Sequence, residues 1–244
     1  MNPTLTVLLY SSVAAAAAAL GAIPLRRRAG LPLSWIGWSN ALAAGLMLGA
    51  AFMLTQENAD QASLPLAGGA LLGILFTHWT HVVTGTSELD LNRLDDVDPT
   101  YGYRVMMTGT LHSASEGIAI GVAMFIDIAF GISMAVAIAV HNVPEAAIQS
   151  AVMRSRGVSP RDAAGLAVAA NLSQVLLAVV TFAVVNAAPA VLPWVLGFAV
   201  GALINLVLVE LLPESYKQAG TTSIALVTFV AMSMVALVRW LVAT

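Results

Sequence analysis

The feature that most constrains this chain is a series of eight apolar runs, each of about 20 residues. A helix that rises about 1.5 Å per residue needs about 20 residues to cross the ~30 Å of hydrocarbon in a bilayer. The runs cover residues 5–25, 34–54, 64–86, 104–126, 128–153, 163–187, 190–212 and 222–242. Because the backbone in lipid must satisfy its own hydrogen bonds, they predict an all-α polytopic membrane protein, with eight transmembrane helices in one membrane domain over residues 1–244.

The composition excludes an ordinary soluble enzyme. Of the 244 residues, 59% are hydrophobic and only 9% are charged, whereas soluble domains are about 25% charged. The chain has no cysteine, which excludes disulfides, thiolate metal sites, iron–sulfur clusters and cysteine nucleophiles. A transition-metal site would therefore have to use His, Met or carboxylate ligands. The net charge of −3 gives no indication of nucleic-acid binding.

The basic residues are distributed unevenly between the two ends of these runs. Of the 10 Lys and Arg residues, nine lie in or beside the segments after the first, third, fifth and seventh runs, and only Arg239 lies near the end of the eighth. Cytoplasmic loops of membrane proteins are enriched in Lys and Arg. We therefore expect these loops to be cytoplasmic and both termini to be outside, in a bacterial inner membrane. The first run has no basic residue before it, so we expect a retained helix rather than a cleaved signal peptide.

The longest loop, residues 87–103, is acidic and is predicted to be cytoplasmic. Its simplest interpretation is a solvated loop, and the alternative is a weak cation-collecting surface at a cytoplasmic mouth. His78 and His81 lie just before it and share a helix face. We interpret this pair as structural, with a transient metal site as the alternative. The acidic residues of the loop are Glu88, Asp90, Asp95, Asp96 and Asp98.

A weak internal repeat links the second and seventh runs. The segment ALAAGLML, residues 41–48, resembles GFAVGALI, residues 197–204, so that Ala43 and Gly45 match Ala199 and Gly201. Small residues are common at helix contacts in membranes, so the match could arise by chance. It also fits a 3+2+3 arrangement with inverted repeats, because the first three and last three of eight helices have opposite orientations.

Ionisable residues at membrane depth are concentrated in the fourth and fifth runs. His112 and Glu116 lie four residues apart in one, and His141 and Glu145 in the other. This spacing places each His and its Glu on one helix face. A carboxylate at the centre of a bilayer costs at least ~2.5–3.5 kcal/mol. A divalent cation between the two helices would compensate this cost, and zinc, iron and manganese accept such ligands.

Other polar or special residues of the runs have more general interpretations. Pro144 lies between His141 and Glu145 and leaves a helix carbonyl without its usual partner, which is either a tolerated kink or an opening beside a cation path. Gly117, next to Glu116, would permit the close approach of another helix. The remaining polar residues are each interpreted as helix–helix hydrogen-bonding groups: Gln149, Ser150, Asn171, Gln174, Asn205 and Glu210.

Four motifs resemble those of the ZIP (Zrt-, Irt-like protein) family of divalent metal transporters. They are HSASEG in the fourth run and HNVPEA in the fifth, together with AAGLML in the second and LVELLPES at the end of the seventh. The eight predicted helices and the polar loop after the third are also similar to the family pattern. The resemblance covers nearly the whole membrane part of the chain.

The resemblance implies transport of a divalent transition metal, with zinc foremost and iron, manganese or cadmium as other substrates, by elevator-type uptake into the cytoplasm. It also implies a homodimer, and a transporter rather than an enzyme, without a catalytic cofactor. In the implied elevator motion, helices 1, 4, 5 and 6 move against helices 2, 3, 7 and 8. The implied principal site comprises Met47, His112, Glu116, His141 and Glu145, and a second site adds Ser113, Asn142 and Gln174.

The chain departs from the family pattern at several of these positions. Ser113 stands where Asn is usual, Ser115 where Pro is usual and Ala146 where Gly is usual. Gln174 occupies a position that often holds Glu, so the second site has no carboxylate of its own. Two nearby dications repel each other strongly in a medium of low dielectric. We therefore expect one principal metal site and a weakened second one.

Three other classes of function fit parts of the sequence. The first is a haem-binding membrane redox protein with His112 and His141 as axial ligands, although a haem iron does not require the adjacent glutamates. The second is an intramembrane metalloenzyme, for which no HExxH motif is present. The third is a proton-coupled transporter without a metal.

Overall fold

The computed structural model describes residues 2–26, 32–56, 64–85 and 100–243, and in the last range it leaves the side chains of 239, 242 and 243 undescribed. Most of the acidic loop, from 87 to 99, lies outside the described residues. The predictions that it is cytoplasmic and collects cations, through Glu88 and its neighbours, therefore stay predictions.

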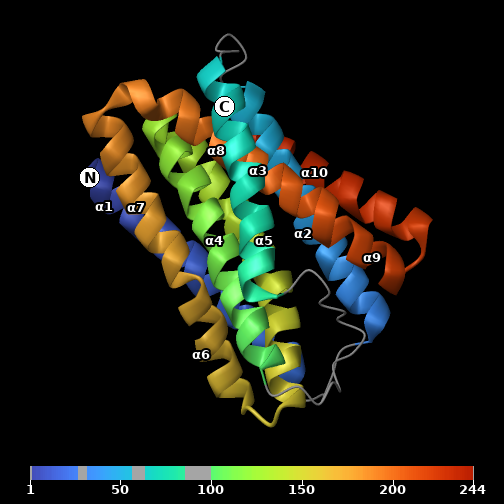
Figure 1. Ribbon diagram of the computed structural model, residues 1–244. Coiled ribbons are helices and arrows are strands. Elements are labelled where there is room, and N and C mark those ends of the chain that lie inside the picture. Colours follow the sequence, from blue (N-terminus) through green and yellow to red (C-terminus); the bar gives the residue numbers. More distant parts are fainter. Residues whose placement is uncertain (1, 27–31, 57–63, 86–99, 244) are drawn as a thin grey trace.

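The described backbone is helical and contains no strand. Its elements form eight consecutive helical segments, which coincide with the predicted runs to within a few residues (Figure 1). They are α1 (Pro3–Ala17) with η1 (Ala18–Ala22) and η2 (Pro24–Arg26); α2 (Leu33–Gln56); α3 (Leu64–Thr84); α4 (Tyr101–Ile126); α5 (Ile128–Ser155); α6 (Pro160–Ala170) with α7 (Leu172–Ala187); η5 (Pro189–Val191), α8 (Leu192–Leu206), η6 (Val207–Leu211) and α9 (Leu212–Gln218); and α10 (Thr221–Ala243).

Seven of these segments are long and apolar enough to cross a membrane. The exception is α4, which is long enough but carries the polar side chains of the candidate site, including His112, Ser113 and Glu116. None of these three residues is more than 7% exposed, so α4 is shielded from lipid by its neighbours along this stretch. The chain is thus an all-α polytopic membrane protein.

The packing of the helices follows the predicted inverted repeat. The second segment packs along the eighth (α2 on α10), and the seventh packs along the third (α8 on α3). The first segment packs on the fifth (α1 and η1 on α5), and the sixth packs on the fourth (α7 on α4). These contacts are the ones expected if segments 1–3 repeat as 6–8 and α4 repeats as α5.

The two matched glycines of the repeat have the same role. A Cβ at Gly45 would collide with the carbonyl oxygen of Thr228 in α10, and a Cβ at Gly201 would collide with that of Ala70 in α3. Each glycine therefore permits backbone-to-backbone contact between paired helices, as small residues do in membranes. The weak resemblance between the two segments reflects a shared packing requirement.

The two halves of the bundle differ in polarity. An apolar core, which includes Met47, Ile120, Phe130 and Leu203, fills the half that contains the N-terminal part of α5. The other half contains the end of α5, where Arg154 and Arg156 lie. We call this second half the basic half of the bundle.

Candidate metal centre

The first cluster of ionisable side chains comprises Glu116 of α4 with His141 and Glu145 of α5, and we call it the Glu-His-Glu group. The Nε2 atom of His141 lies 2.8 Å from Oε1 of Glu116 and 3.4 Å from Oε2 of Glu145. His141 and Glu145 share a face of α5 because they lie four residues apart. The spacing therefore predicted the pairing within α5, and the packing of α4 on α5 adds Glu116.

The burial of this group makes it a costly arrangement without a cation. The side chain of Glu116 is 0% exposed and that of His141 is 3% exposed. Oε2 of Glu116 has no hydrogen-bond partner among the described residues. A buried carboxylate is strongly destabilising unless an opposite charge or a set of donors compensates it. Two carboxylates and one imidazole have the chemistry to hold a divalent metal ion.

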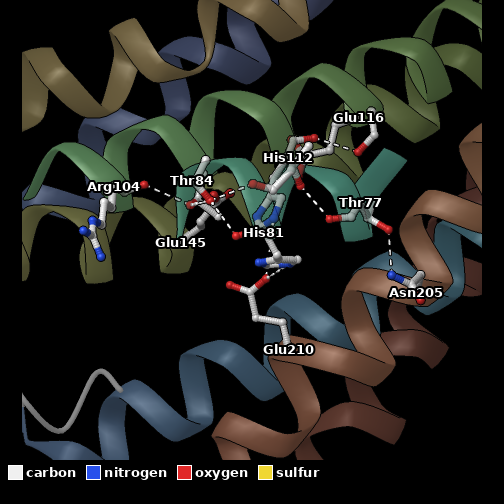
Figure 2. A network of polar contacts seen from close by, with 12 residues as sticks. Thr77, His81, Thr84, Arg104, His112, Glu116, Glu145, Asn205 and Glu210 are labelled. Carbon is white, nitrogen blue, oxygen red and sulfur yellow. Dashed lines mark hydrogen bonds and ion pairs between the residues drawn. The ribbon is translucent and has the colours of Figure 1, made fainter. Parts of the chain in front are cut away.

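The second cluster comprises His81 of α3, His112 of α4 and Glu210 of η6, and we call it the His-His-Glu group. Oε2 of Glu210 lies 3.1 Å from Nε2 of His81 and 3.5 Å from Nε2 of His112. The two imidazole rings meet edge to face, with centroids 5.6 Å apart. Figure 2 shows Glu210 pointing at both rings from the opposite side of the gap between the helices.

A cavity of about 510 Å³ connects the two groups with the end of the bundle. Its walls include both histidines and the glutamate of the His-His-Glu group, and also His141 and Glu145. It extends to Glu214 and Lys217 of α9, whereas Glu116 lies behind the wall. An ion in the cavity could therefore contact either group.

The residues of the implied principal site are only partly brought together. Glu116, His141 and Glu145 form one group, but His112 contacts the other group instead. Met47 is buried in the apolar core and is not part of the cavity wall, although Ala43, one turn away, is. As ligands of one ion, Met47 and His112 stay predictions.

The residues of the implied second site are neutral groups with two separate sets of hydrogen bonds, one around Asn142 and one around Ser113. The side-chain nitrogen of Asn142 donates to the carbonyl oxygen of Ala14 and to Oε1 of Gln174, both at 2.9 Å. The hydroxyl of Ser113 donates to Oδ1 of Asn171 at 3.0 Å. Only Oδ1 of Asn142 is left without a partner among the described residues of these two sets. The set around Asn142 thus joins α5 to both α1 and α7.

Two expectations about individual residues can be compared directly with the structure. Gly117 was expected to permit the close approach of another helix, and a Cβ there would collide with the carbonyl oxygen of Gln174 in α7, which confirms it. His81 and Glu210 were interpreted as structural groups, and their grouping with His112 was missed. The signal was the presence of Glu210 at membrane depth, but nothing in the sequence connects it to α3.

The haem alternative finds no support in this geometry. It requires His112 and His141 to face each other across an iron. Instead, Nε2 of His112 faces Glu210 and Nε2 of His141 faces Glu116 and Glu145.

The sequence matches the profile described as ZIP Zinc transporter over residues 93–237, which is more than half of the chain. The chain belongs to the ZIP family. The matched part contains α4, α5 and η6. It therefore includes every residue of the two groups except His81. Members of the ZIP family are transporters, which fits the expectation that this protein is not an enzyme.

Two named relatives can be aligned with almost the whole of this chain. A protein of Arabidopsis thaliana, provisionally named a zinc transporter, is 36% identical over 90% of this chain, which spans 36% of that relative's length. The zinc transporter GufA of Myxococcus xanthus is 28% identical over 86% of this chain and 88% of its own length. This chain therefore spans about a third of the plant relative and most of the bacterial one.

Proposed function

We propose that this protein transports divalent transition-metal cations across a membrane, with zinc foremost and iron, manganese or cadmium as other substrates. The observation that carries the proposal is the presence of two separate groups of metal-ligating side chains, which both contribute to the wall of one cavity. The bacterial relative GufA is named a zinc transporter, which supports zinc as the substrate.

The distances within each group suit a transition metal. Two ligands bonded at about 2.0–2.1 Å to a tetrahedral zinc ion lie about 3.4 Å apart. The closest nitrogen-to-oxygen distances are 2.8 and 3.4 Å in the Glu-His-Glu group. They are 3.1 and 3.5 Å in the His-His-Glu group. Small rotations of these side chains would admit an ion, with water or a further residue as the fourth ligand.

We propose that the Glu-His-Glu group is the main substrate site, because its two carboxylates balance the charge of a dication. Met47 and His112 are its predicted further ligands. The neutral residues Ser113, Asn142 and Gln174 would then form a weakened second site, with one tightly held ion per chain.

The direction of access follows from the distribution of charge. The cavity extends towards the basic half of the bundle, and the apolar core fills the other half. Loops rich in Lys and Arg face the cytoplasm in membrane proteins. We therefore infer a conformation open to the cytoplasm, with both termini outside and a bacterial inner membrane as the location. Uptake would follow an elevator motion in a homodimer, as the family resemblance suggests.

Metal uptake into proteoliposomes tests this function. The purified protein is reconstituted and supplied with Zn²⁺, Fe²⁺, Mn²⁺ or Cd²⁺, and uptake is compared for the wild type and His141→Ala. We expect saturable uptake by the wild type and its loss in the variant. Glu214→Gln is the matched control, because Glu214 lies in the same cavity wall but binds Gln218 and Lys217 and belongs to neither group. Equal uptake by all three proteins, or none by the wild type, would refute the proposal.

A further inference from the structure

The third and seventh helical segments run parallel and pack in a regular register over their first halves. A Cβ at Gly69 would collide with the carbonyl oxygen of Trp194, and one at Gly73 would collide with that of Phe198. Four residues along α3 thus correspond to four residues along α8. This is the register of two α-helices with the same 3.6 residues per turn.

Further along this interface the contacts are polar and join side chains. The side-chain nitrogen of Asn205 donates to Oγ1 of Thr77 at 2.6 Å. The next contact along the interface joins Glu210 to His81. Between these two side-chain contacts, four residues on α3 correspond to five on the seventh segment. Figure 2 shows these two contacts one after the other along the same face of α3.

The extra residue is accommodated by the π-helical turn η6. The backbone N–H of Leu212 donates to the carbonyl oxygen of Val207, five residues earlier, instead of four. In an uninterrupted α-helix, a residue five positions after Asn205 would be turned away from it by about 140°. Val209, four positions after Asn205, would then face α3 in its place. Glu210 reaches the two histidines only because the turn is wide.

Pro213 explains why the wide turn persists. In an α-helix, the ring of a proline clashes with the carbonyl group four residues earlier, which here belongs to Val209. A π-helical turn immediately before the proline moves that carbonyl group away. Pro193 offers a contrast, because it lies at the start of α8, where a proline is tolerated in a regular helix.

We propose that η6, maintained by Pro213, is the device that positions Glu210 as a metal ligand beside His81 and His112. Pro213 is thus a positioning residue for the His-His-Glu group, although it contacts no metal itself. The metal-binding part of this inference rests on the proposed function, and the register part does not. The π-helical turn acts as a one-residue adjustment between two parallel helices.

Cysteine cross-linking measures the register without any metal. The chain has no cysteine of its own, so introduced pairs react without background. One pair is His81→Cys with Glu210→Cys, and the other is His81→Cys with Val209→Cys. Each pair is made with and without Pro213→Ala. The proteins are then treated with a short bis-thiosulfonate cross-linking reagent. We expect the 81–210 pair to react at least tenfold faster when Pro213 is present, and the 81–209 pair to become the faster one in Pro213→Ala.

A pair above the turn monitors folding in the same experiment. Thr77→Cys with Asn205→Cys should react equally in every background, because that contact precedes η6. Suppose that this control pair reacts equally in every background. The inference is then wrong if, in Pro213→Ala, the 81–210 pair still reacts faster than the 81–209 pair, or if neither pair reacts. Pro193→Ala is the matched proline control and should leave the order of reactivity unchanged.

Co²⁺ binding then measures the consequence for the metal. In the Glu145→Gln background, which weakens the Glu-His-Glu group, we expect Pro213→Ala to lower the affinity for Co²⁺ by roughly 10-fold to 100-fold, as the loss of an orienting residue does at other metal sites. We also expect the visible absorption of the His-ligated ion to be lost, whereas Pro193→Ala keeps it. If Pro213→Ala leaves the affinity for Co²⁺ and the visible absorption unchanged, Pro213 does not position Glu210. This conclusion holds even if the wild type transports metal. A transport-inactive wild type with the expected cross-linking would refute only the proposed function.

Discussion

Glu116 is the side chain on which the proposed site depends most. It is fully buried, one of its oxygens has no hydrogen-bond partner among the described residues, and the other pairs with the imidazole of His141. The sequence predicted its depth and its position one turn after His112. It did not predict that the two side chains would separate into different groups, because that depends on how Glu210 and His81, 129 residues apart in the chain, meet in space.

Replacing either carboxylate of the Glu-His-Glu group should abolish high-affinity binding. In Glu116→Gln and Glu145→Gln the charge that balances the dication falls by one unit in a poorly solvated place. We expect calorimetry in detergent to show at least a 100-fold weaker Zn²⁺ affinity for each variant, with an unchanged helical circular dichroism spectrum. Wild-type affinity in both variants would show that these carboxylates serve only folding.

Gln174 is the residue that we expect to limit the number of ions held by the proposed site. Its Oε1 accepts a hydrogen bond from Asn142, and it brings no charge. Two unit charges ~4 Å apart repel by about 4 kcal/mol at an effective dielectric of 20, and two dications repel more strongly. We expect anomalous scattering to show one well-occupied metal in this region of the wild type, and Gln174→Glu to raise the occupancy of a second. Two fully occupied ions in the unaltered protein would contradict the assignment.

Several pairs of helices approach to backbone contact at glycine residues. The prediction of an all-α protein with eight helical segments was confirmed, because the length and hydropathy of the runs determine it. The irregular parts were not predicted: the break at Asn171 between α6 and α7, the 3₁₀ turns after α1, and the π-helical turn η6. For η6 the sequence does contain a local signal, Pro213, but it was not recognised. No local pattern was recognised for the other two.

A methyl group at Gly73 should loosen the pair formed by α3 and α8. Its Cβ would collide with the carbonyl oxygen of Phe198, which belongs to the backbone and cannot rotate away. Overpacking of this kind costs about 1–3 kcal/mol. We expect Gly73→Ala to lower the midpoint of thermal unfolding in detergent. Gly165→Ala is the control, because a Cβ there meets nothing within 4 Å, and alanine should stabilise α6 by roughly 0.5–1 kcal/mol. Equal midpoints for the two variants would argue against a tight α3–α8 contact.

The two groups differ in how they relate to the proposed motion of the whole molecule. The Glu-His-Glu group lies entirely on α4 and α5, which belong to the proposed moving set with α1, α6 and α7. The His-His-Glu group joins His112 of that set to His81 of α3 and Glu210 of η6 in the other set (Figure 2). Thr108 of α4 also donates to Thr84 of α3, at 3.4 Å. One group would therefore travel with its ion, and the other would form only in the conformation observed.

Removing His81 should consequently shift the molecule away from this conformation. A state that loses one or two kcal/mol of specific contacts falls in population by roughly 5-fold to 30-fold relative to its alternative. Ile148→Cys places a thiol in the cavity wall, where a membrane-impermeant reagent applied from the basic end can reach it. We expect His81→Ala to slow this labelling severalfold, because the cavity is open for less of the time.

Lys217→Ala serves as the control for that measurement. Lys217 also lies in the cavity wall, but it pairs with Glu214 of its own helix, at 3.2 Å, and so joins no part of one set to the other. Its removal should leave the labelling rate unchanged. If His81→Ala labels as fast as the wild type, or if both variants slow labelling equally, the bridge formed by His112, His81 and Glu210 does not hold the cavity open. The His-His-Glu group would then contribute to ion passage alone, and the preference for the observed conformation would have to come from the apolar core, which seals the half of the bundle opposite the arginines.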